Sequence, residues 1–102
     1  MKFISQILPD VYVIKLEYHQ DMRGFFVRTF CSHEFKIHGL NTTMVQSNLS
    51  FSHKKFTLRG MHYQVGTSAE AKLVRCLQGR IQDVIIDLRL SSPTYCQFLS
   101  FD

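Results

Sequence analysis

The chain has 102 residues, of which 45% are hydrophobic and 20% are charged, and its formal net charge at neutral pH is +4. This composition excludes a disordered chain, and the length indicates a single domain with a modest core. The small basic excess fits an anionic ligand. Because Lys54-Lys55 is the densest basic cluster, the sequence argues against a nucleic-acid partner.

Cysteine spacing and the N-terminal segment bear on the cellular compartment. Cys31, Cys76 and Cys96 lie far apart and form no CxxC pair, which argues against a disulfide framework or a zinc knuckle. Free cysteines favour a reducing, cytoplasmic compartment. The only N-terminal apolar run is short and is interrupted at Pro9 and Asp10, so we predict neither a signal peptide nor a membrane span.

The first elements in chain order are strands. Residues 11–17, VYVIKLE, are rich in β-branched and aromatic residues and predict a strand. Residues 21–24, DMRG, have turn chemistry, and residues 25–30 predict the next strand.

Residues 32–39 predict the one helix of the chain. Ser32 is the expected N-cap, Glu34 suits the first turn, and Gly39 is placed to end the helix. Only about two turns fit in this length.

From Met44 onward the pattern predicts strands. In residues 44–51, MVQSNLSF, a polar face that includes Gln46 and Asn48 alternates with an apolar face. Residues 72–90 predict two strands joined at Gln78-Gly79, a hairpin that would make Lys72 and Asp83 diagonal neighbours.

Many short strands with little helix indicate an all-β fold, an antiparallel sandwich or jelly roll that spans residues 1–102 as one domain. A last strand begins after Pro93 and stops at Asp102 without a closing turn or partner. Half a jelly roll leaves an unpaired edge and an uncovered apolar face. We therefore expect that the chain is cut short relative to the fold it encodes, or completes itself through another chain.

A histidine on the inner face of a jelly roll first suggests a metal site. Such sites typically present H-x-H followed by a glutamate, but here Gln64 stands two residues after His62. Glu70 and His53 remain as further ligands, and one imidazole with one carboxylate rarely holds a transition metal. We therefore predict no metal cofactor.

The other use of a lone histidine is as a general base, for which its pKa near neutrality is suited. A base that removes a proton next to a carbonyl needs a cation to stabilise the enolate, and Lys72 is the candidate, with Asp83 keeping it protonated and oriented. The alternatives are an ordinary surface histidine and an ordinary cross-strand ion pair between Lys72 and Asp83.

Four blocks occur in order: DMRGFFVRTF, VQSNLSFS, TLRGMHYQ and KLVRCLQGRIQDVIIDLRLSSPTY. Together they resemble the dTDP-4-dehydrorhamnose 3,5-epimerase family from about Leu8 to the last residue. The resemblance implies a cofactor-independent epimerase with a cupin-like jelly roll, usually a homodimer that exchanges N-terminal strands. The implied reaction converts dTDP-4-dehydro-6-deoxy-D-glucose to dTDP-4-dehydro-L-rhamnose by inversion at carbons 3 and 5, for dTDP-rhamnose and lipopolysaccharide biosynthesis.

The resemblance also implies roles for individual residues. His62 matches the base and Lys72 the cation that stabilises the enolate. The positions that match substrate-binding residues are Arg23 and Arg59, which hold the diphosphate, and the nucleotide-contacting stretch Gln46, Ser47 and Asn48. Arg23 reaches toward a neighbouring subunit in this reading. Arg28 departs from the family, because the best-known members carry a substrate-site glutamate there, and this leaves the sugar or nucleotide preference open.

The resemblance further implies that members continue well past Asp102. That continuation holds the tyrosine that acts as the acid and the carboxylate that orients the base; Tyr63 and Tyr95 are not equivalent to that tyrosine. We therefore expect that these 102 residues alone do not turn over substrate efficiently. The alternatives are a related 3-epimerase or ketoisomerase of nucleotide sugars, and a catalytically incomplete sugar-nucleotide-binding protein.

One conflict concerns the spacing of two candidate site residues. Arg59 and His62 are three positions apart, so a regular strand would send them to opposite faces. Glycine inside a strand often marks a bulge, and we predict a kink at Gly60-Met61.

Overall fold

The computed structural model describes residues 1–102 and consists mostly of extended backbone. The strands are β1 (Lys2–Ser5), β2 (Tyr12–Lys15), β3 (Tyr18–Asp21), β4 (Gly24–Val27), β5 (Asp83–Ile86) and β6 (Phe98–Phe101). They form three separate two-stranded antiparallel sheets, β1–β2, β3–β4 and β5–β6. The helical elements are α1 (Ser32–Ile37) and the 3₁₀ turn η1 (Gly66–Ser68). Neither helix is long and apolar enough to cross a bilayer.

The turn predicted over DMRG is confirmed as the loop of the β3–β4 hairpin. Asp21 pairs with Gly24 across the two-residue loop, and the Asp21 carboxylate accepts the backbone N–H of Arg23 at 2.8 Å. Such a bond from Asp to the backbone two residues on is a standard turn-forming contact. Gly24 takes a φ of +129°, which a side chain would resist.

The predicted helix is confirmed, but its predicted N-cap is wrong. Cys31 occupies the N-cap with extended backbone and no side-chain capping bond, and Ser32 is the first helical residue. Glu34 lies in the first turn as expected. The helix ends at Ile37, and Gly39 follows with a φ of +70°, the left-handed conformation that terminates many helices.

A small aromatic cluster joins α1 to the β1–β2 hairpin. Phe35 is buried, and its ring lies edge-on to Phe3 at 5.4 Å and to Phe30 at 4.8 Å between centroids. Phe3 also stacks on His38 at 4.1 Å. Leu8, in the loop after β1, is the only other buried hydrophobic residue. The core of the chain is therefore confined to its N-terminal third.

Two long stretches are extended but unpaired. Residues 41–64 and 70–82 take part in no backbone–backbone hydrogen bond. The strand predicted at residues 44–51 is therefore not a paired strand. The chain bends at Gln78-Gly79 as predicted, and Gly79 has a φ of +80°, but the predicted hairpin pairing of the two arms is wrong. β5 pairs instead with β6, through Asp83 opposite Phe101. The last strand thus has a partner, contrary to our expectation.

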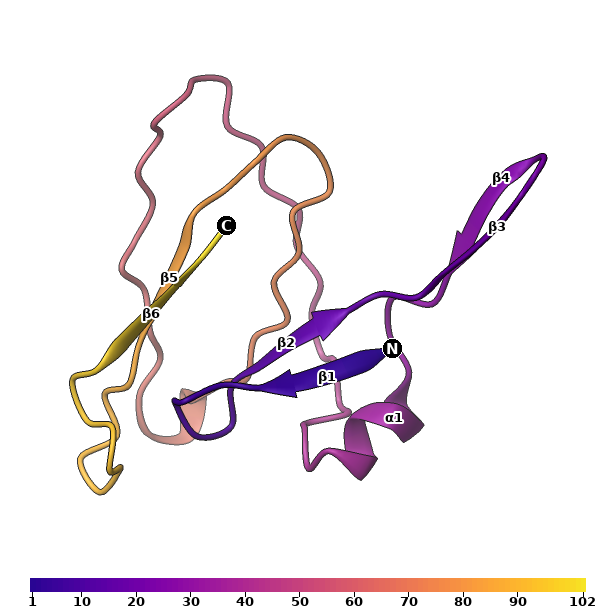
Figure 1. Cartoon of the computed structure of the whole chain (residues 1–102). Helices are drawn as coiled ribbons and strands as arrows, with labels where there is room; N and C mark the ends of the chain where they lie inside the picture. Colours follow the sequence, from indigo (N-terminus) through magenta and orange to yellow (C-terminus); the bar gives the residue numbers. More distant parts are fainter.

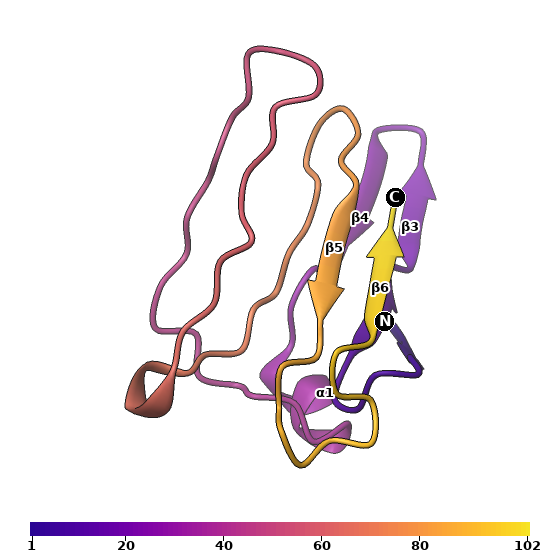
Figure 2. The same ribbon diagram turned by 90° about the vertical axis from the view of Figure 1, so that its left-hand side faces the viewer.

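The reason for the missing pairing is the path of the chain. In Figure 1 residues 44–50 and 70–77 run through the centre of the molecule, whereas residues 57–65 and β5–β6 run along its left side. Figure 2 separates all of these segments across the view. Residues 44–50, 57–65, 70–77 and β5 therefore alternate between two layers, and none of these four segments is paired with the next one in sequence.

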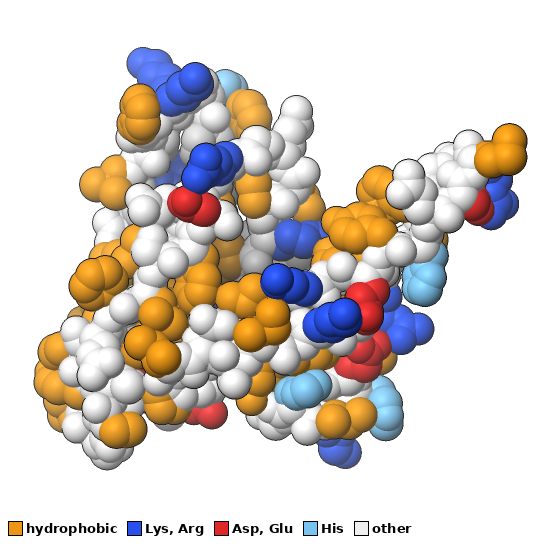
Figure 3. Space-filling model, in the orientation of Figure 1, with side chains coloured by type: hydrophobic (Ala, Val, Ile, Leu, Met, Phe, Trp, Pro, Cys, Tyr) orange, Lys and Arg blue, Asp and Glu red, His pale blue; other side chains and the backbone are white.

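The resulting shape is open. The radius of gyration is 15.5 Å, against about 13 Å for a compact domain of this size. The β3–β4 hairpin projects from the body as an arm (Figure 1). Many large hydrophobic side chains are exposed, and Figure 3 shows them spread over the body and at the tip of the arm.

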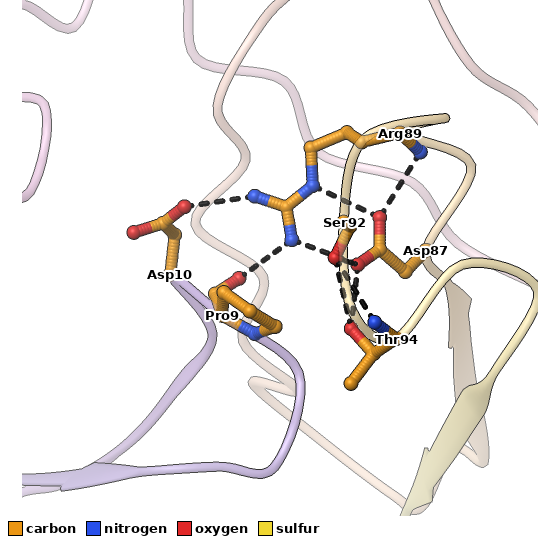
Figure 4. Close-up of polar contacts among 6 residues, drawn as sticks. All are labelled: Pro9, Asp10, Asp87, Arg89, Ser92 and Thr94. Carbon is orange, nitrogen blue, oxygen red and sulfur yellow. Dashed lines mark hydrogen bonds and ion pairs between the residues drawn. The ribbon is translucent and has the colours of Figure 1, made fainter.

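An ionic cluster ties the N-terminal loop to the β5–β6 hairpin (Figure 4). Asp87 is only 5% exposed and binds the Arg89 guanidinium through both carboxylate oxygens, each at 2.9 Å. The same guanidinium donates to the Asp10 carboxylate at 2.8 Å and to the Pro9 carbonyl at 3.0 Å. Hydrogen bonds from Arg89, and then from the Ser92 hydroxyl, hold the pKa of Asp87 well below its usual range.

This cluster predicts that the β5–β6 connection loosens in acid. A carboxyl whose pKa is lowered by folding contributes stability that is present above its ordinary pKa of about 3.9 and is lost as the pH falls below it. The amide of Cys96 donates to the Asp87 carbonyl at 2.8 Å and reports on this connection. We expect its hydrogen-exchange protection factor to fall in acid, and Asp87→Asn to lower that protection already at neutral pH. Glu70→Gln, on a different segment, is the control. Equal protection in Asp87→Asn and the wild type would contradict the role given to the cluster.

Candidate active site

His62 lies on the open segment that follows the predicted kink. Gly60 has a φ of +102°, so the backbone leaves regular strand geometry there, as predicted. The alternation that would send Arg59 and His62 to opposite faces is therefore interrupted between them. The His62 side chain is exposed and its ring makes no hydrogen bond within the chain. Its two nitrogens are free to meet a ligand.

Lys72 forms an ion pair with Glu70, which the sequence had suggested only as a possible metal ligand. Its ammonium lies 3.2 Å from the Glu70 carboxylate, and both side chains are about half exposed. The predicted pairing with Asp83 is wrong, because the hairpin that would make them neighbours is absent and Asp83 instead begins β5. Alternating residues on one extended segment point to the same side, which brings Glu70 and Lys72 together. The two-residue spacing of Glu70 and Lys72 in the sequence was the signal that could have predicted this ion pair.

Arg59 is held by the segment that precedes it in the chain. Its guanidinium donates to the Ser52 hydroxyl at 3.3 Å and to the Phe51 carbonyl at 3.2 Å. These are neutral acceptors, so its positive charge is not neutralised by a carboxylate. An arginine in this state retains its affinity for phosphate oxygens.

The stretch Gln46, Ser47 and Asn48 presents unused polar groups. All three residues are exposed on the open segment 41–64, and none of their side chains is hydrogen-bonded within the chain. Amide and hydroxyl groups of this kind donate and accept hydrogen bonds. These side chains can therefore bind a ligand that carries both hydrogen-bond donors and acceptors.

Arg23 lies in the loop of the projecting arm, and Arg28 follows the last residue of β4; both are already paired with carboxylates. Arg23 binds Asp21 at 2.6 Å on the fully exposed loop, which raises its pKa and lowers that of Asp21. Arg28 binds Glu34 at 2.8 Å. The Arg28 hydrogen bond, and then the N-terminal ammonium at 3.1 Å, lower the pKa of Glu34. No pattern in the sequence predicted the ion pair between Arg28 and Glu34.

Two surface pockets lie at the base of the arm and on the arm itself, and neither is lined by His62. One, of about 230 Å³, is lined by Met1, Glu17, His19, Phe26, Arg28 and Glu34. The other, of about 500 Å³, is lined by residues of β3 and β4 and includes Arg23. In both Figure 1 and Figure 2 the arm lies away from residues 57–65. A single chain therefore does not bring Arg23 or Arg28 together with Arg59 and His62.

The arrangement divides the candidate residues between two regions. The open segments carry an imidazole, an ammonium group and a guanidinium without a carboxylate partner, which suit proton abstraction and anion binding. These three groups favour acid–base chemistry on an anionic substrate. No group of three His, Cys, Asp or Glu residues is arranged to hold a metal ion.

Comparison with known proteins identifies the family of the chain. The family model described as dTDP-4-dehydrorhamnose 3,5-epimerase matches residues 5–102. The chain belongs to this family. It is 41% identical to the dTDP-4-dehydrorhamnose 3,5-epimerase of Salmonella typhimurium, over 97% of the chain and 54% of that protein. The Pseudomonas aeruginosa protein of the same name is 38% identical over the same shares of the two chains.

A solved structure extends the match to the backbone. The crystal structure of dTDP-4-dehydrorhamnose 3,5-epimerase from Elizabethkingia anophelis superposes with a TM-score of 0.94 and 40% identity, covering 99% of this chain and 55% of that chain. This likeness confirms the predicted all-β, cupin-like jelly-roll class for the part of the fold that is present. The chain spans about half the length of these relatives.

The backbone at Gly60 gives a direct test of the site geometry. A Cβ at position 60 would lie 3.5 Å from the backbone nitrogen of His62, which is an ordinary van der Waals distance. The destabilisation by Gly60→Ala therefore comes from the φ of +102° and amounts to about 1–3 kcal/mol. We expect Gly60→Ala to shift the His62 imidazole resonances in NMR spectra. D-alanine at position 60, introduced by ligation, tolerates positive φ and should leave them nearly unchanged. Identical shifts for both residues would show that the kink does not position His62.

Proposed function

We propose that the chain provides part of the active site for epimerisation of dTDP-4-dehydro-6-deoxy-D-glucose at carbons 3 and 5. The product is dTDP-4-dehydro-L-rhamnose, an intermediate of dTDP-rhamnose synthesis for surface polysaccharide such as lipopolysaccharide. The observation that carries the proposal is the family match over residues 5–102, which includes every candidate site residue. Relatives over 37% identical bear the name of this activity.

The proposed chemistry begins at His62. A ketone at carbon 4 makes the C–H bonds at carbons 3 and 5 acidic, so an imidazole can remove the proton from either carbon. The electron pair moves into the enolate, whose oxygen Lys72 stabilises as a cation. Inversion is complete when the carbon receives a proton on its opposite face, from the acid that the family resemblance places beyond Asp102. Neither redox change nor group transfer occurs, and the residues alone supply base and cation. The contact with Glu70 holds the Lys72 ammonium group on the open segment.

We assign binding of the nucleotide to the remaining polar side chains. Arg59 binds the diphosphate, since only neutral groups now hold its guanidinium. Gln46, Ser47 and Asn48 contact the nucleotide through side chains that are free in the chain. Asp83 has no place beside Lys72 in this structure, and we assign it to the wall of the site on β5 rather than to orientation of the lysine.

The arm accounts for the two remaining arginines. Because Arg23 lies in the loop of the projecting β3–β4 hairpin and Arg28 directly follows β4, we propose that they serve the site of a partner subunit in a homodimer. Exposed aromatic residues on the same hairpin, Phe25 and Phe26 among them, would be covered by that contact. Residues 1–102 then form part of one jelly-roll domain, acting in the cytoplasm without nucleic acid or membrane as partner.

Deuterium exchange tests the proposed base. In D₂O the chain should incorporate deuterium at carbons 3 and 5 of the 4-keto sugar nucleotide, with little of the L-configured product formed by these residues alone. His62→Asn should slow incorporation by about 10²–10⁴-fold, the usual contribution of a general base. His53→Asn is the matched control, an exposed histidine on the neighbouring connection.

The labelled positions, read by NMR, distinguish the possible outcomes. Equal rates in the two histidine variants would contradict the role of His62. Label at only one carbon would favour a 3-epimerase or ketoisomerase, and substrate binding without label would favour a binding protein. Clear production of the L-sugar by the chain alone would show that the rest of the relatives' length is dispensable.

Sedimentation tests the proposed dimer. Phe25→Ser removes a large exposed ring from the arm and should weaken dimerisation by about ten-fold or more, equivalent to about 1.4 kcal/mol. Leu90→Ser, an exposed hydrophobic residue outside the arm, is the control. If both variants sediment alike, the arm is not the dimer contact.

A further inference from the structure

We propose that Ser52 is a positioning residue, which orients the guanidinium of Arg59 so that one edge of the group stays open to the diphosphate of the nucleotide. The proposal rests on the proposed function, in which Arg59 binds that diphosphate. Ser52 acts through the guanidinium and not by contact with the substrate. The carbonyl of Phe51, the neighbouring residue, holds the same edge of the guanidinium as Ser52 does.

The first support is the kind of partner that Arg59 has. Other arginines of the chain bind carboxylates at 2.6–2.9 Å, namely Arg23, Arg28, Arg80 and Arg89. The partners of Arg59 are instead a hydroxyl at 3.3 Å and a carbonyl at 3.2 Å, longer than the about 2.7–2.9 Å of a bond between a guanidinium and an anion. These neutral contacts orient the guanidinium, and they leave its charge available to a phosphate.

The second support is the set of guanidinium hydrogens that remain free. A guanidinium carries five N–H donors in one plane. The Ser52 hydroxyl accepts the hydrogen of Nε, and the Phe51 carbonyl accepts one hydrogen of Nη2. Both hydrogens of Nη1 and the other hydrogen of Nη2 have no partner within the chain. The Nη1–Nη2 edge therefore keeps the two parallel N–H groups that bind two phosphate oxygens side by side.

The third support is the loop that carries Ser52 and Arg59. Residues 51–59 form the loop at the top of Figures 1 and 2, between the central segment and the one on the left side of Figure 1. No backbone–backbone hydrogen bond closes this loop. A second hydroxyl, that of Thr57, donates to the Lys54 carbonyl at 2.8 Å and does not reach the guanidinium. The two hydroxyls therefore allow orientation of Arg59 to be separated from closure of the loop.

Binding of deoxythymidine diphosphate tests the proposal, with thymidine as the probe that lacks phosphate. Both are titrated into the ¹⁵N-labelled chain and followed by NMR. Ser52→Ala should weaken binding of the diphosphate by about three- to ten-fold, the effect of one hydrogen bond, and should leave the affinity for thymidine unchanged. Ser52→Thr keeps the hydroxyl and should restore the affinity. The ¹⁵Nε resonance of Arg59 should move in Ser52→Ala and return in Ser52→Thr.

Thr57→Ala is the matched control, because it removes a hydroxyl bond of the same loop that does not involve Arg59. This variant should bind the diphosphate as tightly as the wild type does. Equal diphosphate affinities in Ser52→Ala and the wild type would overturn the proposal. An equal loss in Ser52→Ala and Thr57→Ala would also overturn it, since Ser52 would then act only by closing the loop.

Arg59→Gln distinguishes failure of this proposal from failure of the proposed function. Weaker diphosphate binding in Arg59→Gln but not in Ser52→Ala would overturn the role of Ser52 alone. Diphosphate binding by Arg59→Gln as tight as that of the wild type would overturn the diphosphate role of Arg59, and the role of Ser52 with it. A wild-type chain that binds the diphosphate no more tightly than thymidine would have the same consequence.

Discussion

Backbone hydrogen bonding is the constraint on which the rest of this structure depends. An extended segment is held in place when its N–H and C=O groups are paired on at least one side. Residues 41–64 and 70–82 have no such pairing, although they follow the path of the family's fold. Because the chain alternates between two layers, each of these segments lacks a hydrogen-bonded strand neighbour within residues 1–102. The open shape and the exposed hydrophobic residues are consequences of this arrangement.

The well-bonded parts of the molecule are small. The aromatic cluster around Phe35 fixes α1 against β1–β2, and the Asp87–Arg89 cluster fixes the N-terminal loop against β5–β6. Both clusters join segments that lie far apart in the sequence. In contrast, His62, Lys72 and Arg59 lie on the open segments. The candidate catalytic groups are therefore carried by the part of the chain that depends most on outside contacts.

The sequence predicted the locally determined features. The β2 strand, the DMRG turn, the short helix and the kink at Gly60 follow from residue types within a few positions, and the structure has all four. The cap at Ser32 was wrong because the preceding residue, Cys31, already provides the extended backbone that precedes the helix. Each of these features depends on residues only a few positions apart in the sequence.

Non-local features were predicted poorly. The Gln78-Gly79 hairpin was a reasonable inference from turn chemistry, but the layer alternation separates its two arms and with them Lys72 and Asp83. The Asp87–Arg89 cluster was missed, although Asp-x-Arg followed by Ser92 and Thr94 was a visible hint of turn-forming hydrogen bonds. The strand pattern predicted the sandwich or jelly-roll class, but it did not predict which segments pair within that fold.

Residue-level amide hydrogen exchange on the isolated 102-residue chain tests the central claim most directly. The account predicts protection in β1–β2, α1 and β5–β6, and near-intrinsic exchange throughout residues 44–50, 57–64 and 70–77. Protection of these three segments equal to that of β5–β6 in the isolated chain would contradict it, because their backbone would then have found partners within residues 1–102.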